Sequence, residues 1–226
     1  MTQRTRGRLI VFEGVEGAGK STQLQRLGGH LARAGVVHRT FREPGGTPLG
    51  DSIRALLLDP RSTISARAEA LLFMASRAQL VALELKPALE AGTTVLLDRF
   101  FLSTYAYQIA GRGLAESDVR SANVMATHGL APDLTLLLTL PADVGLARAG
   151  QRSGPDRIER SGRDFHARVE SAFAEFATRD WQRSHEECGP IVALDAAGAQ
   201  DAVEALVLDA VTSRFEELRL ALGAIA

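Results

Sequence analysis

Residues 14–21 constrain the fold of this chain more than any other part of its sequence. They fit the pattern G-x-x-x-x-G-K-[ST] without a mismatch, and they follow a short apolar run at residues 9–12. Glycines in such a loop let successive backbone N–H groups turn toward bound phosphates, while the lysine reaches phosphate oxygens and the serine holds Mg²⁺. The pattern therefore predicts a strand, a phosphate-binding loop and a helix in succession.

The lysine of this loop stands out against the rest of the chain. Lys20 and Lys86 are the only two lysines among 26 basic residues, so arginine fills nearly every other basic position. An ammonium group is a compact point charge, whereas a guanidinium is a planar fork. Retention of lysine at position 20 indicates that the loop needs the compact cation.

Composition narrows the class of protein. The chain has 226 residues, a formal net charge of -1 and 46% hydrophobic residues, which suits one α/β domain over residues 1–226 and disfavours a nucleic-acid or membrane-surface protein. Cys188 is the single cysteine, so an internal disulfide is excluded and a reducing compartment is favoured. Because no apolar run approaches the length of a membrane span, we predict a cytoplasmic protein.

Strand-like and helix-like segments alternate along the chain. Strands are predicted at residues 9–12, 36–41, 94–97, 134–140 and 191–194. Helices are predicted at 20–34, 49–58, 66–91, 163–187 and 202–222, with two more between 103 and 128 and one starting at 143–149. This alternation predicts a three-layer fold like that of the P-loop NTPases, with a five-stranded parallel sheet, helices on both faces and a short lid at about residues 148–160.

Ligands of such sheets bind at the carboxyl ends of the strands. Three motif-like segments are predicted to meet there, namely the glycine loop, residues 42–47 and residues 98–99. Asp98 ends an apolar strand, where a carboxylate commonly holds Mg²⁺ together with the loop serine, here Ser21. Asp98 could instead cap a helix, but next to the loop the metal role is favoured.

The sequence also bears on the type of reaction. A guanine-reading Asn-Lys-x-Asp motif cannot exist, because the only lysine outside the loop, Lys86, lies in the sequence Leu-Lys-Pro-Ala. A small phosphotransferase remains, and it needs arginines over the transferred phosphoryl group. Arg148, Arg152 and Arg157 lie around two glycines and a proline, which predicts a mobile basic lid, with a solvated charged loop as the alternative.

Two pairs of residues at helical spacing suggest a site for a nucleobase. Phe73 and Arg77 lie four residues apart and share one helix face, where an aromatic ring and a guanidinium suit stacking and hydrogen bonding to a base. Thr104 and Gln108 form a second pair. Taken alone, each pair also fits a simpler structural reading, as a core Phe with a surface Arg or as an exposed helix start.

These motifs together resemble the bacterial thymidylate kinase family, whose members phosphorylate dTMP to dTDP. The resemblance extends over about residues 9–206, and several independent motifs occur in the family's order. They are found at residues 12–22, 42–47, 68–77, 98–99, 102–108, 111–113, 132–134 and 156–159.

The resemblance implies roles for individual residues. ATP would be bound by Gly14, Val15, Glu16, Gly17, Ala18, Gly19, Lys20, Ser21 and Thr22. dTMP would be bound by Arg54, Phe73, Arg77, Arg99, Thr104 and Gln108. The catalytic residues would be Lys20, Glu16, Arg99 and the lid arginine Arg152, and Mg²⁺ would be held by Ser21 and Asp98.

The resemblance has limits and leaves alternatives open. Phe100 stands where the family commonly has His or Tyr, and residues 218–226 extend beyond the part that matches. Expected partners are ATP, dTMP and a second copy of the chain in a homodimer, with no nucleic acid and no membrane. The alternatives are a kinase for another nucleoside monophosphate and a non-catalytic nucleotide-binding module.

Overall fold

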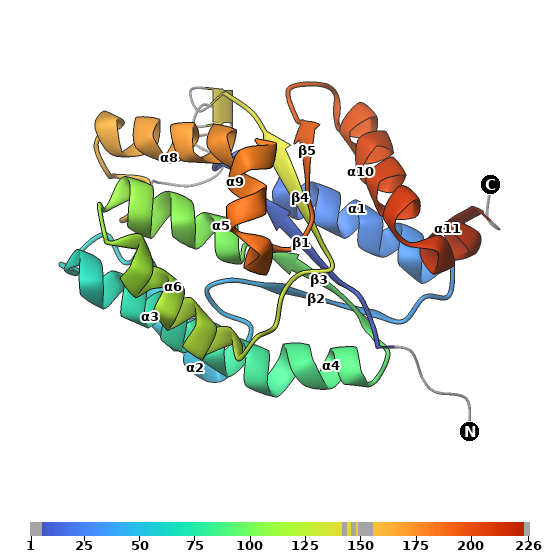
Figure 1. Cartoon of the computed structure of the whole chain (residues 1–226), viewed down its shortest axis with the longest axis horizontal. Coiled ribbons are helices and arrows are strands. Elements are labelled where there is room, and N and C mark those ends of the chain that lie inside the picture. The colour runs from blue at the N-terminus through green and yellow to red at the C-terminus, as the bar shows by residue number, and fades with distance from the viewer. Residues whose placement is uncertain (1–5, 142–143, 146–147, 149–155, 224–226) are drawn as a thin grey trace.

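A five-stranded parallel sheet forms the middle of the molecule, with helices on both of its faces (Figure 1). The structure is a computed structural model and describes residues 6–141, 144, 145, 148 and 156–223. The strands lie in the order β2-β3-β1-β4-β5. They are β1 (Leu9–Glu13), β2 (His38–Arg42), β3 (Thr94–Asp98), β4 (Leu134–Thr139) and β5 (Ile191–Asp195). The predicted α/β fold is confirmed, and each strand boundary lies within two residues of its prediction.

The helices follow the predicted alternation. They are α1 (Lys20–Arg33), α2 (Pro48–Leu58), α3 (Ala66–Leu80), α4 (Lys86–Glu90), α5 (Phe101–Thr104), α6 (Glu116–Thr127), α8 (Arg163–Phe176), α9 (Arg179–Ser184), α10 (Gln200–Arg214) and α11 (Glu216–Gly223). Two π-helical segments, η1 (Val81–Leu85) and η2 (Tyr105–Gly111), continue α3 and α5, and the 3-10 turn η3 (Glu186–Cys188) precedes β5. In the described part of the chain, no helix is long and apolar enough to cross a membrane.

Two predicted helices are wrong as single helices. The segment 163–187 breaks at Thr178, which takes an extended conformation and accepts a hydrogen bond from the Trp181 backbone N–H, so that it caps α9. The segment 202–222 breaks at Phe215, whose extended backbone places its ring in the core. A side-chain cap in the first case, and core packing in the second, ends a helix that apolar spacing alone would continue.

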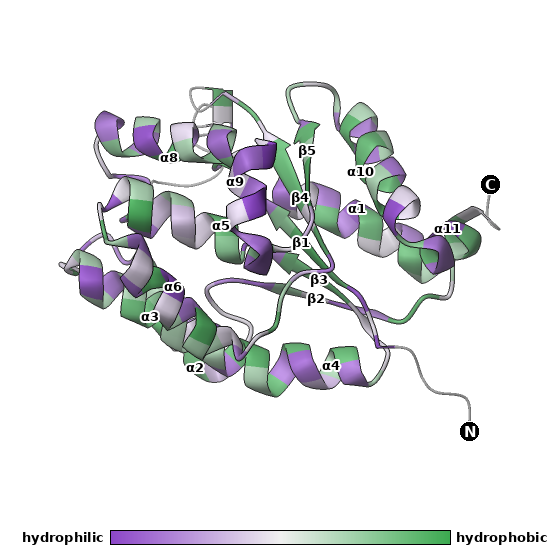
Figure 2. Cartoon of the chain, viewed as in Figure 1, coloured by the Kyte–Doolittle hydropathy of each residue, from purple (hydrophilic) through white to green (hydrophobic). Residues whose placement is uncertain are grey.

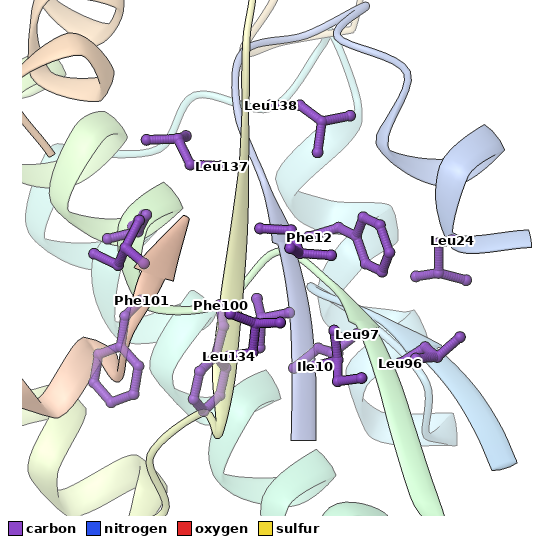
Figure 3. Packing of buried hydrophobic residues seen from close by; sticks show 14 of the residues in the cluster. Ile10, Phe12, Leu24, Leu96, Leu97, Phe100, Phe101, Leu134, Leu137 and Leu138 are labelled. Carbon is purple, nitrogen blue, oxygen red and sulfur yellow. The ribbon is translucent and has the colours of Figure 1, made fainter. Parts of the chain in front are cut away.

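The core lies between the sheet and its helices. Apolar residues fill the central strands (Figure 2), and β1 is fully buried along its length, as expected for a parallel strand covered on both faces. Figure 3 shows Phe12 and Leu138 on the side of Leu24 from α1, with Leu137 and Phe101 on the opposite side. This packing fixes the strand ends, and therefore the loops that follow them.

Backbone hydrogen bonds join the three predicted segments at the carboxyl edge of the sheet. The Arg99 N–H donates to the Phe12 carbonyl at 2.9 Å, and the Glu43 N–H donates to the Asp98 carbonyl at 2.9 Å. The ends of β1, β3 and β2 are thus held side by side. The prediction that the glycine loop, residues 42–47 and residues 98–99 meet at one edge is confirmed.

Candidate active site

The glycine loop connects β1 to α1 and has the conformation that its sequence predicts. Gly17 and Gly19 take φ values of 74° and 90°, a region in which side chains other than glycine are strained. A Cβ at Gly17 would also lie 2.0 Å from the Gly145 carbonyl oxygen. The loop therefore exposes its backbone N–H groups ahead of the N-terminus of α1, which is an arrangement that binds phosphate.

Lys20 begins α1 and folds back over the loop. Its Nζ donates to the carbonyl oxygens of Gly14 at 3.1 Å and Val15 at 2.7 Å. Burial and the nearby charge of Arg99 lower the pKa of Lys20 to about 8. The ammonium is therefore poised to gain stabilisation from an incoming anion.

Ser21 and Asp98 are brought together from different elements. The Ser21 Oγ donates to the Asp98 Oδ2 at 2.7 Å, linking the first turn of α1 to the end of β3. A hydroxyl and a carboxylate at this distance are hard oxygen donors of the kind that Mg²⁺ takes alongside phosphates and water. Among the described residues there is no group of three or more His, Cys, Asp or Glu side chains that could hold a metal unaided. The pair thus fits a cation that arrives with a nucleotide.

Two cavities adjoin at this edge of the sheet. The smaller, about 170 Å³, is lined by Glu16, Gly17, Gly19, Lys20, Ser21, Thr22, Arg42, Glu43, Arg54, Asp98 and Arg99. The larger, about 370 Å³, is lined by Glu16, Glu43, Pro44, Arg54, Leu58, Phe73, Arg77, Arg99, Ser103, Thr104, Tyr107, Gln108, Asp156, Ile158 and Glu159. All six residues predicted to bind the acceptor line the larger cavity.

Two predicted arginines belong to both cavities. Arg99 takes a left-handed backbone conformation with φ of 72°, and its Nη2 donates to the Glu16 carboxylate at 2.8 Å. Arg54 projects from α2 and donates to the Pro44 carbonyl at 3.1 Å. Burial, together with the charges of Arg42 and Arg99, lowers the pKa of Arg54. In the smaller cavity four cations, Lys20, Arg42, Arg54 and Arg99, face three carboxylates, so it suits an anionic group.

Arg77 is the most constrained of the predicted residues. Its side chain is only 2% exposed and forms a salt bridge to the buried Glu43 at 2.6 Å. It also donates to the Phe100 carbonyl at 2.7 Å and to the Asn123 side-chain oxygen. Of the five N–H groups of the guanidinium, these contacts engage Nε, both on Nη2 and one on Nη1. Within the described part of the chain, one Nη1–H has no other partner and is left for a ligand.

Two of the three arginines predicted to lie in a lid form contacts with other elements of the fold. Arg148 donates to the carbonyl oxygens of Ala196 and Ala197 after β5. Arg157 donates to the Leu57 carbonyl at 2.7 Å and pairs with Glu69 at 2.7 Å. Both guanidiniums are thus tied to other elements, while Arg152 lies outside the described residues.

Sequence reasoning missed several residues of the site. Glu43 holds Arg77, and it could have been found because it directly follows β2 at the carboxyl edge. Asn123 lies outside the motifs, and Glu69 lies in the motif at residues 68–77 without a role assigned to it, since each reaches the site only through the tertiary fold. Ser103 joins the site through the Arg99 side chain, to which its Oγ lies at 2.9 Å.

A glycine loop, a serine–carboxylate pair and an adjoining cavity that shares Arg54 and Arg99 with the cavity at the loop define a P-loop protein of the phosphotransferase class. The sequence profile described as "Thymidylate kinase" matches residues 12–186. The thymidylate kinase of Deinococcus radiodurans is 46% identical over 210 residues, covering 93% of this chain and 98% of that protein. The thymidylate kinase of Cyanothece sp. (strain PCC 7425 / ATCC 29141) is 44% identical, covering 94% of each chain. This chain belongs to the thymidylate kinase family.

Proposed function

We propose that this chain transfers the γ-phosphoryl group of ATP to the phosphate of dTMP, which yields dTDP and ADP. The observation that carries this proposal is the shared wall of the two cavities. Glu16, Glu43, Arg54 and Arg99 line both, so a phosphate in the larger cavity lies next to the phosphates cradled by the glycine loop. Proximity of this kind supplies much of the catalysis when little covalent chemistry is required.

The donor nucleotide binds to residues 14–22. Backbone N–H groups of the loop and the Lys20 ammonium contact its phosphates, while Ser21 and Asp98 would hold Mg²⁺. The metal would neutralise charge on the phosphate oxygens. Lys20 exchanges its present contacts with the Gly14 and Val15 carbonyls for contacts with the phosphates. A hydrogen bond from an ammonium to a charged phosphate oxygen is stronger than one to a neutral carbonyl oxygen.

The acceptor occupies the larger cavity. Its phosphate lies between Arg54 and Arg99, and its base stacks on Phe73. The remaining Nη1–H of Arg77 donates to the thymine O4. Thr104 and Gln108 form the polar wall around the base. Cytosine carries an amino group in place of O4, so the amino group and the Arg77 Nη1–H, which are both hydrogen-bond donors, would face each other.

One of the three lid arginines is proposed to stabilise the transition state, and the contacts of the other two decide which one. Arg148 and Arg157 are committed to backbone carbonyls and to Glu69, so we assign the role to Arg152. Its guanidinium would neutralise charge on the transferred phosphoryl group together with Lys20 and Arg99.

The protein acts as a homodimer in the cytoplasm in this proposal. Exposed apolar side chains on neighbouring helices, Leu71 of α3 with Val124 and Met125 of α6, supply a surface that a second copy would cover. A single buried cysteine fits a reducing compartment.

A coupled assay with ATP, Mg²⁺ and a panel of dTMP, dUMP, dCMP and AMP tests the function. We expect dTMP to be the preferred acceptor, and Lys20→Ala to reduce kcat about 10²–10³-fold, the cost of one preorganised donor. Lys86→Ala serves as the matched control, because Lys86 lies on the surface and donates to the His128 carbonyl. Preference for another monophosphate, or ATP binding without turnover, would establish one of the two alternatives.

A further inference from the structure

Glu69 of α3 is a buried carboxylate that lies beside the base-binding cavity without lining it. Its side chain is 1% exposed. Arg112, after η2, donates to its two oxygens at 3.0 Å each, and Arg157 approaches one of them at 2.7 Å. A carboxylate held by two guanidiniums from different segments has a fixed position and orientation.

The two arginines also fix the charge of Glu69. Burial by itself would raise its pKa, but the hydrogen bonds from Arg112 and the adjacent positive charge of Arg157 outweigh burial, so that the pKa is lowered. Glu69 is therefore ionised at neutral pH. An ionised carboxylate has no hydrogen to donate, so every partner of Glu69 must be a donor.

Gln108 is the partner for which this restriction matters. Its side-chain amide lies 3.1 Å from Glu69 and its residue lines the larger cavity. An amide has a donor end and an acceptor end of nearly equal shape. Because Glu69 only accepts, the NH₂ end of Gln108 must face it, and the carbonyl oxygen is the end left for a ligand.

The carbonyl oxygen of Gln108 suits one kind of pyrimidine. Thymine carries a hydrogen on N3 and can donate to that oxygen, whereas N3 of cytosine is an acceptor and cannot. We propose that Glu69 is a positioning residue for base specificity, which acts by fixing the orientation of the Gln108 amide. This inference rests on the proposed function and extends it to a residue that does not touch the base.

The test is the ratio of kcat/KM for dTMP to that for dCMP, measured for the wild type and for Glu69→Gln. An amide at position 69 can donate as well as accept, so the Gln108 amide can turn over and present its NH₂ group to N3 of cytosine. We expect the ratio to fall about tenfold, in keeping with the cost of one mismatched hydrogen bond. A purely structural role for Glu69 would lower the melting temperature and leave the ratio unchanged.

Two controls separate orientation from charge and packing. Glu84→Gln makes the same change in a Glu–Arg pair on η1, where Glu84 contacts Arg39 at 2.7 Å, and it should keep the wild-type ratio. Arg157→Met leaves Glu69 paired with Arg112 and should keep the ratio too. If Glu69→Gln does not fold, the double variant Glu69→Gln/Arg157→Met removes one of the two arginines that have lost their carboxylate partner. The same tenfold fall in the ratio of kcat/KM for dTMP to that for dCMP is expected.

The outcomes distinguish the inference from the function on which it rests. A wild type that selects dTMP, with a Glu69→Gln or double variant whose ratio stays within twofold, overturns the inference alone. A wild type that uses dTMP and dCMP equally overturns the inference together with the preference for dTMP, and a wild type that does not phosphorylate dTMP overturns the proposed function itself.

Discussion

The lowered pKa of Lys20 affects both the stability of the fold and the binding of phosphate. Its pKa in the nucleotide-free protein is lowered from 10.5 to about 8 by burial and by Arg99. Between these two values the unfolded chain binds more protons than the folded one, so the free energy of unfolding should increase as pH rises through this window. The charge that attracts phosphate is lost over the same range.

ATP affinity should therefore fall as pH rises above about 8, by up to about tenfold per pH unit while binding requires protonated Lys20. Isothermal titration calorimetry between pH 7 and 9.5 measures this slope and the accompanying proton uptake. Lys86→Ala should reproduce the wild-type profile, and Lys20→Arg should be flat because arginine stays charged. A wild-type profile without a slope would contradict the assignment.

Arg77 and Glu43 form a second informative pair at the residue scale. Burial raises the pKa of Glu43, and the Arg77 guanidinium opposes that rise. Arg77→Met leaves a buried carboxylate without its cation and should cost about 3–5 kcal/mol of stability. Denaturant unfolding measures this loss.

A double variant separates the stability of this pair from its role in recognition. Arg77→Met/Glu43→Gln removes the unpaired charge, so it should recover most of the stability without recovering dTMP kinase activity. If activity returned together with stability, Arg77 would be a structural residue and not a contact of the base.

Among the elements, α2 begins with both a side-chain cap and a proline. Thr47 is its N-cap and accepts a hydrogen bond from the Gly50 N–H at 3.0 Å, while Pro48 occupies the first turn. This cap fixes the helix that carries Arg54. Thr47→Ala should lower the free energy of unfolding by about 1 kcal/mol and raise the KM for dTMP more than that for ATP.

Thr47→Ser provides the matched control because it keeps the capping hydroxyl. Thermal unfolding and steady-state kinetics on the two variants test the role of the cap. Equal stability of the alanine and serine variants would show that the proline and the packing of α2 suffice to start the helix.

On the scale of the whole molecule, the expectation is a dimer formed through α3 and α6. Leu71 is 60% exposed on α3, so Leu71→Glu should leave the fold intact and shift the sedimentation coefficient to that of a monomer. Leu220→Glu is the matched control, since Leu220 is 62% exposed on α11. A wild type that sediments as a monomer, or a Leu71→Glu variant that remains dimeric, would contradict this surface.

The sequence by itself determined the parts of this protein that depend on local chemistry. Apolar runs set the three central strands β1, β3 and β4, because a strand buried on both faces has to be apolar throughout, whereas the edge strand β2 (HRTFR) is polar and largely exposed. The glycine loop was evident because its conformation requires glycine at fixed positions. Residues 42–47 and 98–99 could be placed because strand ends of a parallel sheet share one edge. The Phe73–Arg77 and Thr104–Gln108 pairs followed from helical spacing and the family resemblance, and their ligand contacts stay predictions.

Only the tertiary structure decided which side chains constrain those predicted residues. Glu43, Glu69 and Asn123 lie far from Arg77 or Gln108 in sequence, and no local pattern shows which of these side chains they contact. The break at Phe215 and the contacts of Arg157 likewise depend on what packs nearby. The physical reason is that hydrogen bonding and burial act between neighbours in space, whereas propensity and periodicity act along the chain. The chain's sequence therefore specified a phosphate-binding sheet edge, and its folding selected the contacts that orient the groups at that edge.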